Sequence, residues 1–277
     1  MSIPLRRLGR TGVDVTVLGL GGEGILRTFG YEKEASAVIS GALDLGITYC
    51  ESARAYSGSE SYYGKVLSER RRDIFLASKS HARDKQGALR HLHETLANMK
   101  TDYLDLWQIH DVRSRAEIEE IFGPSGALEA FLEARQKGLV RFLGVTGHHD
   151  PAIIRQCIEM FDFDTVLMPV NPGEPHYKNF LDEVLPVARA RDMGVIAMKV
   201  YFRGLASRIP GFAGMEPYLR FALSQPVTTA VIGCDDPRQL EENVNFAQSF
   251  QPMTEEEMQV FVFRHADFAR RLMYYKP

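Results

Sequence analysis

The sequence predicts an α/β fold in which eight parallel strands close into a barrel, the (β/α)8 or TIM-barrel architecture. Short apolar segments alternate eight times with amphipathic helical patterns along 277 residues. This gives about 30 residues for each strand–helix unit, the size expected for such a barrel. The chain is 45% hydrophobic and 25% charged, as in an ordinary globular protein. We expect residues 1–277 to form a single domain, because no Pro/Gly/Ser-rich linker divides them.

The strands are predicted from short runs of apolar and β-branched residues, which suit a buried, pleated environment. An Arg/Gly-rich start precedes the first run and is compatible with a hairpin. The predicted strands cover residues 15–20, 46–51, 74–79, 104–110, 140–146, 164–170, 194–200 and 228–232.

The helices are predicted from apolar residues three and four positions apart, the spacing of one helical face. In the first helix this face runs from Ala35 to Leu43, and Gly46 is a plausible stop. Asp150 and Pro151 supply an N-cap and a first-turn proline for another helix. The predicted helices cover residues 31–45, 59–70, 86–99, 126–137, 150–160, 179–191, 216–224 and 237–249, with an extra C-terminal helix over 254–271.

Composition excludes several classes of function. The net charge is −3 and no Lys/Arg run is present, so we expect no nucleic-acid partner. The cysteines Cys50, Cys157 and Cys234 are widely spaced, which argues against a disulfide framework or a metal site. No apolar segment reaches transmembrane length and the start has no signal-like apolar region, so we expect no membrane partner and a cytoplasmic location. The sequence does not determine the oligomeric state.

Four ionisable residues mark the candidate catalytic site: Glu51, Tyr56, Lys79 and His110. Each lies at or just beyond the end of a predicted strand. The C-terminal ends of parallel strands meet on one face, where α/β barrels carry their chemistry. A carboxylate, a phenol, an ammonium and an imidazole gathered there can transfer a proton at neutral pH.

One motif favours a different fold. Residues 19–24 match G-x-G-x-x-G after a strand, and a Rossmann interpretation would make Asp44 the ribose acceptor. That interpretation requires a helix to begin inside the motif, but residues 25–30 intervene before the helical pattern. A glycine-rich first loop is equally expected where a barrel mouth admits a flat ring. The barrel therefore remains the preferred prediction.

The four residues suggest reduction of a carbonyl. Tyr56 is the candidate general acid, although a free phenol has a pKa of ~10, too high for efficient proton transfer at pH 7. The ammonium of Lys79 would lower that pKa, and Glu51 would hold Lys79 in place. His110 would donate a hydrogen bond to the carbonyl oxygen, and a nicotinamide would supply hydride. Each residue alone also has an ordinary structural explanation; the joint placement favours function.

Several spaced motifs resemble those of the aldo-keto reductases. The tetrad of that family matches Tyr56, Lys79 and His110, with Glu51 at the position of an aspartate. Its other motifs fall at Gly144-Val-Thr-Gly147, at Asn171 and at Leu240-Glu-Glu242-Asn243. Gly147-His148-His149 resembles a bacterial branch of the family. The resemblance implies an (α/β)8 barrel that binds NAD(P)H in extended form and reduces a small-molecule aldehyde or ketone.

The resemblance also implies a set of cofactor-binding residues. They are Gly21, Gly22, Thr146, His148, Asn171, Met198, Lys199, Gly233, Cys234, Arg238, Gln239, Glu242 and Asn243. Several nicotinamide contacts of the family are missing, because an asparagine aligns with Gly147, a glutamine with Leu167 and a stacking aromatic with Met198. His148, Asn171 or Lys199 are candidates to replace the lost polar contacts, and the thioether of Met198 can pack on a ring.

The choice between NADP(H) and NAD(H) stays open. The basic residues of NADPH binders align with Gly233, Cys234 and Gln239, while Arg238 is one position off. Asp235 and Asp236 would repel a 2′-phosphate, although the start of the Pro237 helix can cradle phosphate. Two other functions also stay open: a cofactor-binding barrel with weak or lost catalysis, acting as a sensor or regulatory subunit, and a phosphate-dependent lyase or isomerase.

Overall fold

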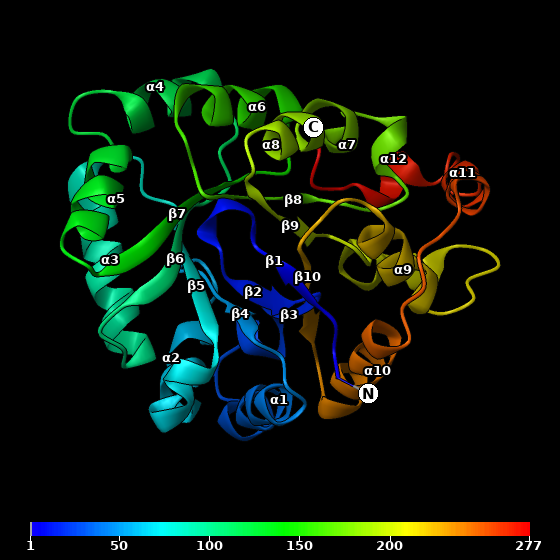
Figure 1. Ribbon diagram of the computed structural model, residues 1–277, viewed down its shortest axis with the longest axis horizontal. Helices are drawn as coiled ribbons and strands as arrows, with labels where there is room; N and C mark the ends of the chain where they lie inside the picture. Colours follow the sequence, from blue (N-terminus) through cyan, green and yellow to red (C-terminus); the bar gives the residue numbers. More distant parts are fainter. Residues whose placement is uncertain (1) are drawn as a thin grey trace.

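The computed structural model describes residues 2–277, and its eight parallel strands form a closed barrel (Figure 1). The strand order around the barrel is β10-β3-β4-β5-β6-β7-β8-β9, so each strand pairs with its neighbour in sequence and β10 pairs with β3. This confirms the predicted fold class. The barrel strands are β3 (Leu18–Gly24), β4 (Tyr49–Glu51), β5 (Phe75–Ser80), β6 (Leu104–Ile109), β7 (Val140–Thr146), β8 (Thr165–Pro169), β9 (Gly194–Met198) and β10 (Thr229–Cys234).

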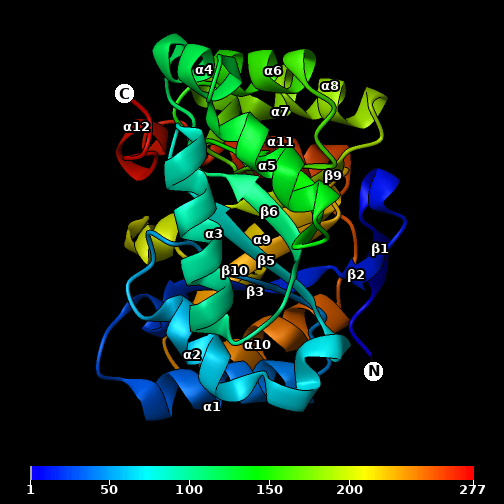
Figure 2. The same ribbon diagram turned by 90° about the vertical axis from the view of Figure 1, so that its left-hand side faces the viewer.

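Helices surround the barrel on its outer side (Figures 1 and 2). Most follow a strand and return the chain to the opposite end of the barrel, as parallel pairing requires. The α-helices are α1 (Glu32–Asp44), α2 (Ser59–Val66), α3 (Lys85–Met99), α4 (Arg115–Phe122), α5 (Ala127–Gln136), α6 (Pro151–Met160), α7 (Phe180–Glu183), α8 (Leu185–Ala190), α9 (Glu216–Ser224), α10 (Pro237–Gln248), α11 (Glu255–Phe263) and α12 (Ala269–Leu272).

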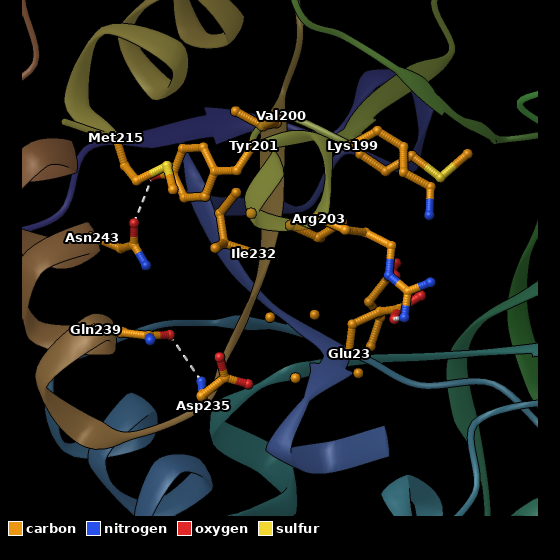
Figure 3. A pocket seen from close by; sticks show the side chains of 18 of the residues that line it. Glu23, Lys199, Val200, Tyr201, Arg203, Met215, Ile232, Asp235, Gln239 and Asn243 are labelled. Carbon is orange, nitrogen blue, oxygen red and sulfur yellow. Dashed lines mark hydrogen bonds and ion pairs between the residues drawn. The ribbon is translucent and has the colours of Figure 1, made fainter. Parts of the chain in front are cut away.

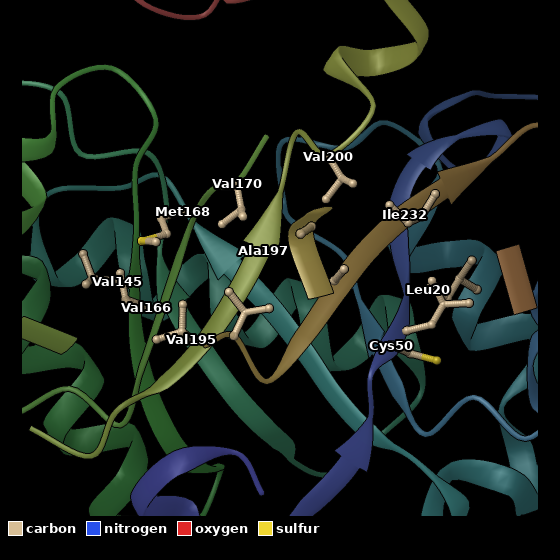
Figure 4. Close-up of a cluster of buried hydrophobic side chains, with 14 of the residues drawn as sticks. Leu20, Cys50, Val145, Val166, Met168, Val170, Val195, Ala197, Val200 and Ile232 are labelled. Carbon is tan, nitrogen blue, oxygen red and sulfur yellow. The ribbon is translucent and has the colours of Figure 1, made fainter. Parts of the chain in front are cut away.

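The strands separate two apolar layers because successive side chains point to opposite faces. Figure 4 shows the outward layer, in which strand residues such as Leu20, Val166 and Ala197 pack beneath the helices. The inward layer fills the barrel with a smaller cluster that includes Tyr49, Phe75 and Leu106. Trp107 belongs to the outward layer and stacks on Phe131 with ring centroids 3.7 Å apart.

An N-terminal hairpin closes one end of the barrel and corrects the predicted first strand. Strands β1 (Leu5–Arg7) and β2 (Asp14–Thr16) form the hairpin, and the barrel strand β3 begins only at Leu18. The predicted strand over 15–20 therefore spans parts of two elements. Glycines are common in β3 because the barrel is crowded there: a Cβ on Gly19 would lie 2.8 Å from the Tyr49 side chain.

The Rossmann alternative is wrong. Strand β3 runs through the whole glycine motif to Gly24, and β10 pairs with it. A short 3-10 turn, Ile25–Arg27, comes next, and α1 begins only at Glu32. Asp44 ends α1 and forms an ion pair with Arg70 at 2.5 Å.

Three predicted helices are shorter or interrupted. The 59–70 helix ends at Val66 and continues as a 3-10 segment, Ser68–Asp73. The 179–191 helix divides into α7 and α8, because Pro186 lacks the N–H that a continuous helix needs. The 254–271 helix divides into α11 and α12 around His265, whose ring bonds the Phe261 carbonyl at 2.6 Å and the Tyr218 hydroxyl at 3.0 Å. Among residues 2–277, no helix is both long and apolar enough to cross a membrane.

Candidate active site

Strand geometry delivers the predicted ionisable residues to the C-terminal mouth of the barrel. On β5, Phe75 and Ala77 belong to the inward cluster, so Lys79 shares their inward face. Glu51 has the same parity as the inward Tyr49 on β4. His110 directly follows β6, and its backbone N–H donates to the Ser80 carbonyl at 2.8 Å.

Lys79 and Glu51 form a buried ion pair, as the sequence predicted. The ammonium Nζ lies 2.7 Å from Glu51 Oε1 and donates a second bond to the Ser52 carbonyl at 2.9 Å. Lys79 is fully buried and Glu51 is 3% exposed. The Tyr49 hydroxyl donates to the other carboxylate oxygen of Glu51 at 3.5 Å. The extra methylene of Glu51 relative to aspartate therefore does not prevent the contact.

Tyr56 lies in the loop after β4, between Lys79 and His110. Lys79 Nζ is 5.1 Å from the centroid of the Tyr56 ring, and the His110 ring meets it edge-on at 5.7 Å. The guanidinium of Arg27 covers the ring at 4.9 Å. Gly22 makes room for it, since a Cβ there would lie 2.8 Å from Tyr56 Cδ2. The ring is thus held on several sides.

The pKa of Tyr56 is shifted opposite to the sequence-based expectation. Burial raises this pKa well above its ordinary value, and the nearby carboxylates Glu51 and Glu23 raise it further. Arg27 opposes the shift by stabilising the phenolate. The ammonium of Lys79, which was expected to lower this pKa, is instead paired with Glu51 at 2.7 Å. Tyr56 consequently retains its proton throughout the neutral pH range, as a proton donor must.

His110 is a neutral imidazole. Burial lowers its pKa well below the ordinary value, and the positive charge of Lys79 lowers it further. Its Nδ1 atom is buried and has no hydrogen-bond partner among residues 2–277. The ring lines a cavity together with Tyr56, so it can offer a neutral donor to a bound oxygen.

Two cavities meet at Tyr56. The first has a volume of about 380 Å³ and lies between the ends of β3, β9 and β10 (Figure 3). Glycine backbone forms part of its wall: a Cβ on Gly21 would lie 3.3 Å from Gly233 N, and a Cβ on Gly233 would lie 2.7 Å from the Glu23 carbonyl carbon. The predicted cofactor residues that line it are Gly21, Gly22, Met198, Lys199, Gly233, Gln239, Glu242 and Asn243.

The first cavity has two chemically different ends. Figure 3 shows Glu23, Lys199 and Arg203 on one side, and Asp235 with Gln239 on the other. At this second end the Asp235 N–H donates to Gln239 Oε1 at 3.0 Å. The Tyr201 hydroxyl donates to Asn243 Oδ1 at 2.6 Å. Sequence reasoning missed the lining residues Tyr201, Arg203, Met215 and Phe246, because they lie on loops and helix faces without a motif, and it missed Glu23, which lies within the glycine motif on β3.

Three predicted cofactor residues line neither cavity. Asn171 is fully buried, and its amide donates to the Lys199 carbonyl at 3.2 Å and the Tyr275 hydroxyl at 2.9 Å. Its Oδ1 accepts from the Gly173 N–H at 3.0 Å, so these polar atoms already have protein partners. Cys234 is 1% exposed and accepts a weak bond from Asn243. Arg238 is exposed on α10 outside the cavity wall.

Two of the predicted cofactor residues, Thr146 and His148, line the second cavity, of about 670 Å³, and not the first. Thr146 Oγ1 accepts from the Asp111 N–H at 2.8 Å and so fixes the loop after β6. Burial lowers the pKa of His148 to about 3, and its Nε2 lies 3.5 Å from Asp111 Oδ1.

The second cavity also contains a group of potential metal ligands. Their ligand atoms lie within 4.8 Å of one another and belong to Asp111, His148 and His149. Arg113 already pairs with Asp111 at 2.5 Å, which supplies a counter-charge without a metal.

The C-terminal segment forms part of the second cavity, which sequence reasoning did not foresee. Tyr274, Tyr275 and Lys276 lie in its wall. Lys276 Nζ is 2.6 Å from Glu174 Oε2 with both side chains fully buried, and the Tyr275 hydroxyl donates to Glu174 Oε1 at 3.0 Å. These contacts join residues about one hundred positions apart, so no local pattern announces them.

This geometry agrees with the relationships of the chain to known proteins. A family model described as the aldo/keto reductase family matches residues 17–209. The chain belongs to the aldo/keto reductase family. The uncharacterized oxidoreductase YqkF of Bacillus subtilis is 25% identical, over 91% of this chain and 94% of the relative. L-galactose dehydrogenase of Arabidopsis thaliana is 29% identical, over 73% and 67% of the two chains.

A solved structure has the same fold. The aldo-keto reductase AKR11C1 from Bacillus halodurans, in its holo form, superposes with a TM-score of 0.80 at 24% identity, over 95% of this chain and 96% of that one. The family match and the closed barrel together confirm the resemblance inferred from the sequence. The chain is an NAD(P)-dependent oxidoreductase of this family.

Proposed function

We propose that this aldo/keto reductase reduces the carbonyl group of a small aldehyde or ketone to an alcohol, with Tyr56 as the proton donor. The observation that carries the proposal is the position of Tyr56 where the two cavities meet, beside the Lys79–Glu51 pair and edge-on to a neutral His110. One cavity then serves the cofactor and the other the substrate.

The first cavity fits an extended dinucleotide. Its glycine walls leave space that side chains would fill, and polar side chains line both of its ends, with Asp235, Gln239 and Asn243 at the end away from Tyr56. A nicotinamide cofactor held there by Gly21, Gly22, Gly233, Gln239, Glu242 and Asn243 would supply hydride to the carbonyl carbon.

We propose that NAD(H) and NADP(H) are both accepted, because among the described residues no cation lines the end of this cavity that contains Asp235 and Gln239.

The protein groups around Tyr56 then perform the proton chemistry. The Tyr56 hydroxyl donates its proton to the developing alkoxide oxygen, and the neutral His110 ring orients that oxygen by a hydrogen bond. The positive charge of Lys79 stabilises the phenolate that remains. Glu51 keeps the ammonium in place, so the charge is available without any rearrangement.

The test compares Tyr56→Phe with Tyr31→Phe. Tyr31 is 50% exposed and lies outside both cavities, so its variant is a matched control. With benzaldehyde and either reduced cofactor, we expect Tyr56→Phe to lower kcat by ~10²-fold or more. Cofactor dissociation constants from nicotinamide fluorescence should stay within about twofold. Near-normal turnover by Tyr56→Phe, where chemistry limits the rate, would contradict the assignment.

One observation favours a second candidate, a barrel that binds the cofactor with little catalysis. Gly147 and Leu167 offer no side-chain hydrogen bond, and the Asn171 amide is engaged with protein groups. Tight cofactor binding by the wild-type protein, without turnover of a broad panel of aldehydes and ketones, would establish this candidate instead.

A further inference from the structure

Three cations gather around a single carboxylate where the two cavities meet. Glu23 pairs with Arg27 at 2.9 Å through one oxygen and with Arg203 at 3.1 Å through the other. Burial lowers the pKa of Lys199 most; among nearby charges Glu23 raises this pKa, whereas Arg203 and Arg27 lower it, so Lys199 lies near all three side chains. Glu23, Lys199 and Arg203 line both cavities, whereas Arg27 lines only the second. This cluster therefore has more positive than negative charge.

Lys199 lacks a counter-charge of its own. Its ammonium makes no ion pair and no hydrogen bond with any residue in the described range 2–277. Its backbone is fixed in a left-handed conformation with φ of 58°, and its carbonyl accepts bonds from Asn171 Nδ2 and the Phe202 N–H. Such a conformation is costly for a non-glycine residue, so the fold holds this side chain at the cavity junction against a local preference.

The other cations of the second cavity are already neutralised. Arg83 pairs with Glu117 at 3.0 Å, Arg113 with Asp111 at 2.5 Å, and Lys276 with Glu174 at 2.6 Å. The unbalanced charge is thus confined to the Glu23 cluster. A partly buried cation without a partner attracts an anion more strongly than one on the open surface, because less water screens it.

We propose that Lys199, with Arg27 beside it, binds the anionic group of the substrate, a carboxylate or a phosphate on a molecule whose carbonyl is reduced at Tyr56. The inference rests on the proposed function and deepens it. Arg27 covers the Tyr56 ring at 4.9 Å and lines only the substrate cavity. Lys199 Nζ lies 6.0 Å from the ring of Tyr275, which also lines only that cavity. Both placements favour a substrate anion over the cofactor diphosphate.

The test uses two aldehydes that differ mainly in charge. 4-Formylbenzoate carries a carboxylate, and methyl 4-formylbenzoate presents the same aldehyde and ring with a neutral ester. We expect the wild-type enzyme to prefer the acid by ~10-fold or more in kcat/KM, since charge-assisted bonds are the strong ones. Lys199→Met should reduce this ratio by ~10-fold, and Lys199→Arg should largely keep it. Lys137→Met, at an exposed lysine of the α5–β7 turn paired with Glu133, is the matched control.

Two further measurements separate the possible failures. If Lys199→Met leaves the acid-to-ester ratio unchanged but weakens cofactor binding by ~10-fold, Lys199 serves the cofactor diphosphate and the proposal is wrong. Calorimetric titration with 4-hydroxymethylbenzoate reports anion binding without turnover. Binding that Lys199→Met abolishes would support the anion site even if wild-type protein reduces neither aldehyde, in which case the proposed function fails. Equal reduction of both aldehydes by wild-type protein would overturn the anion site alone.

Discussion

Replacement of Glu51 by glutamine tests the buried ion pair directly. Glu51 is the only carboxylate paired with Lys79 within the described part of the chain, and the second partner of the ammonium is the neutral Ser52 carbonyl. Glu51→Gln keeps an oxygen that can accept a hydrogen bond but removes the counter-charge. Glu51→Asp keeps the charge on a shorter side chain.

The structure gives the magnitude of the expected effect. Removing one partner of a buried ion pair costs about 3–5 kcal/mol, because the other charge is left uncompensated. We expect Glu51→Gln to lower the free energy of unfolding by ~3 kcal/mol, the lower end of this range, since the amide oxygen can still accept a hydrogen bond from Lys79. In a chain of this size, that corresponds to a Tm lowered by roughly 6–12 °C. Turnover should also fall, because an unpaired Lys79 no longer holds its position beside Tyr56.

Urea unfolding at pH 7, with turnover measured on the same preparations, checks this prediction. The variant Glu51→Gln/Lys79→Met removes both charges and should be more stable than Glu51→Gln alone, because no isolated charge remains. Glu51→Asp should keep much of the activity. Wild-type stability and turnover in Glu51→Gln would show that the pair neither stabilises the barrel nor organises the site.

Two other predictions concern the cofactor and pH. Dissociation constants for NADPH and NADH at fixed ionic strength should differ by less than ~100-fold, equivalent to roughly 2.7 kcal/mol; a larger NADPH preference would mean that a cation such as Arg238 reaches the 2′-phosphate. Burial lowers the pKa of His148 to about 3, so below the ordinary histidine pKa the unfolded chain binds a proton that the folded chain excludes. The free energy of unfolding should therefore fall as pH drops from 6 to 4, by ~1.4 kcal/mol per pH unit from this residue. In His148→Gln the free energy of unfolding should depend less steeply on pH. The same pH dependence in wild type and variant would contradict a lowered pKa of His148.

The barrel and the core of the site were predictable because both follow from strand geometry. Alternation along β5 and β6 determines that Lys79 and His110 face inward, and the parallel arrangement brings the strand ends together. The first strand was misplaced because its glycines resemble a loop. Pairing with β10, as in Cys234 with Gly24, shows that the strand continues through the glycine-rich segment.

Contacts between distant segments give two of the predicted site residues surroundings that the sequence did not indicate. Asn171 was expected to bind the cofactor, but it holds the Tyr275 hydroxyl more than one hundred residues away. The pKa of Tyr56 was expected to fall because Lys79 was considered without the full effect of burial and Glu51. Both differences come from tertiary environment, which a motif cannot specify.

The electrostatics of Tyr56 suit its proposed role as the proton donor in carbonyl reduction. Reduction needs the phenol as proton donor, whereas oxidation of an alcohol needs the phenolate as base. Burial, Glu51 and Glu23 all raise the pKa of Tyr56 and thus populate the phenol at neutral pH. A substrate anion bound at Lys199 would place another negative charge near the ring and act in the same direction. The site that selects an anionic carbonyl compound would therefore also keep Tyr56 in the form that reduces it.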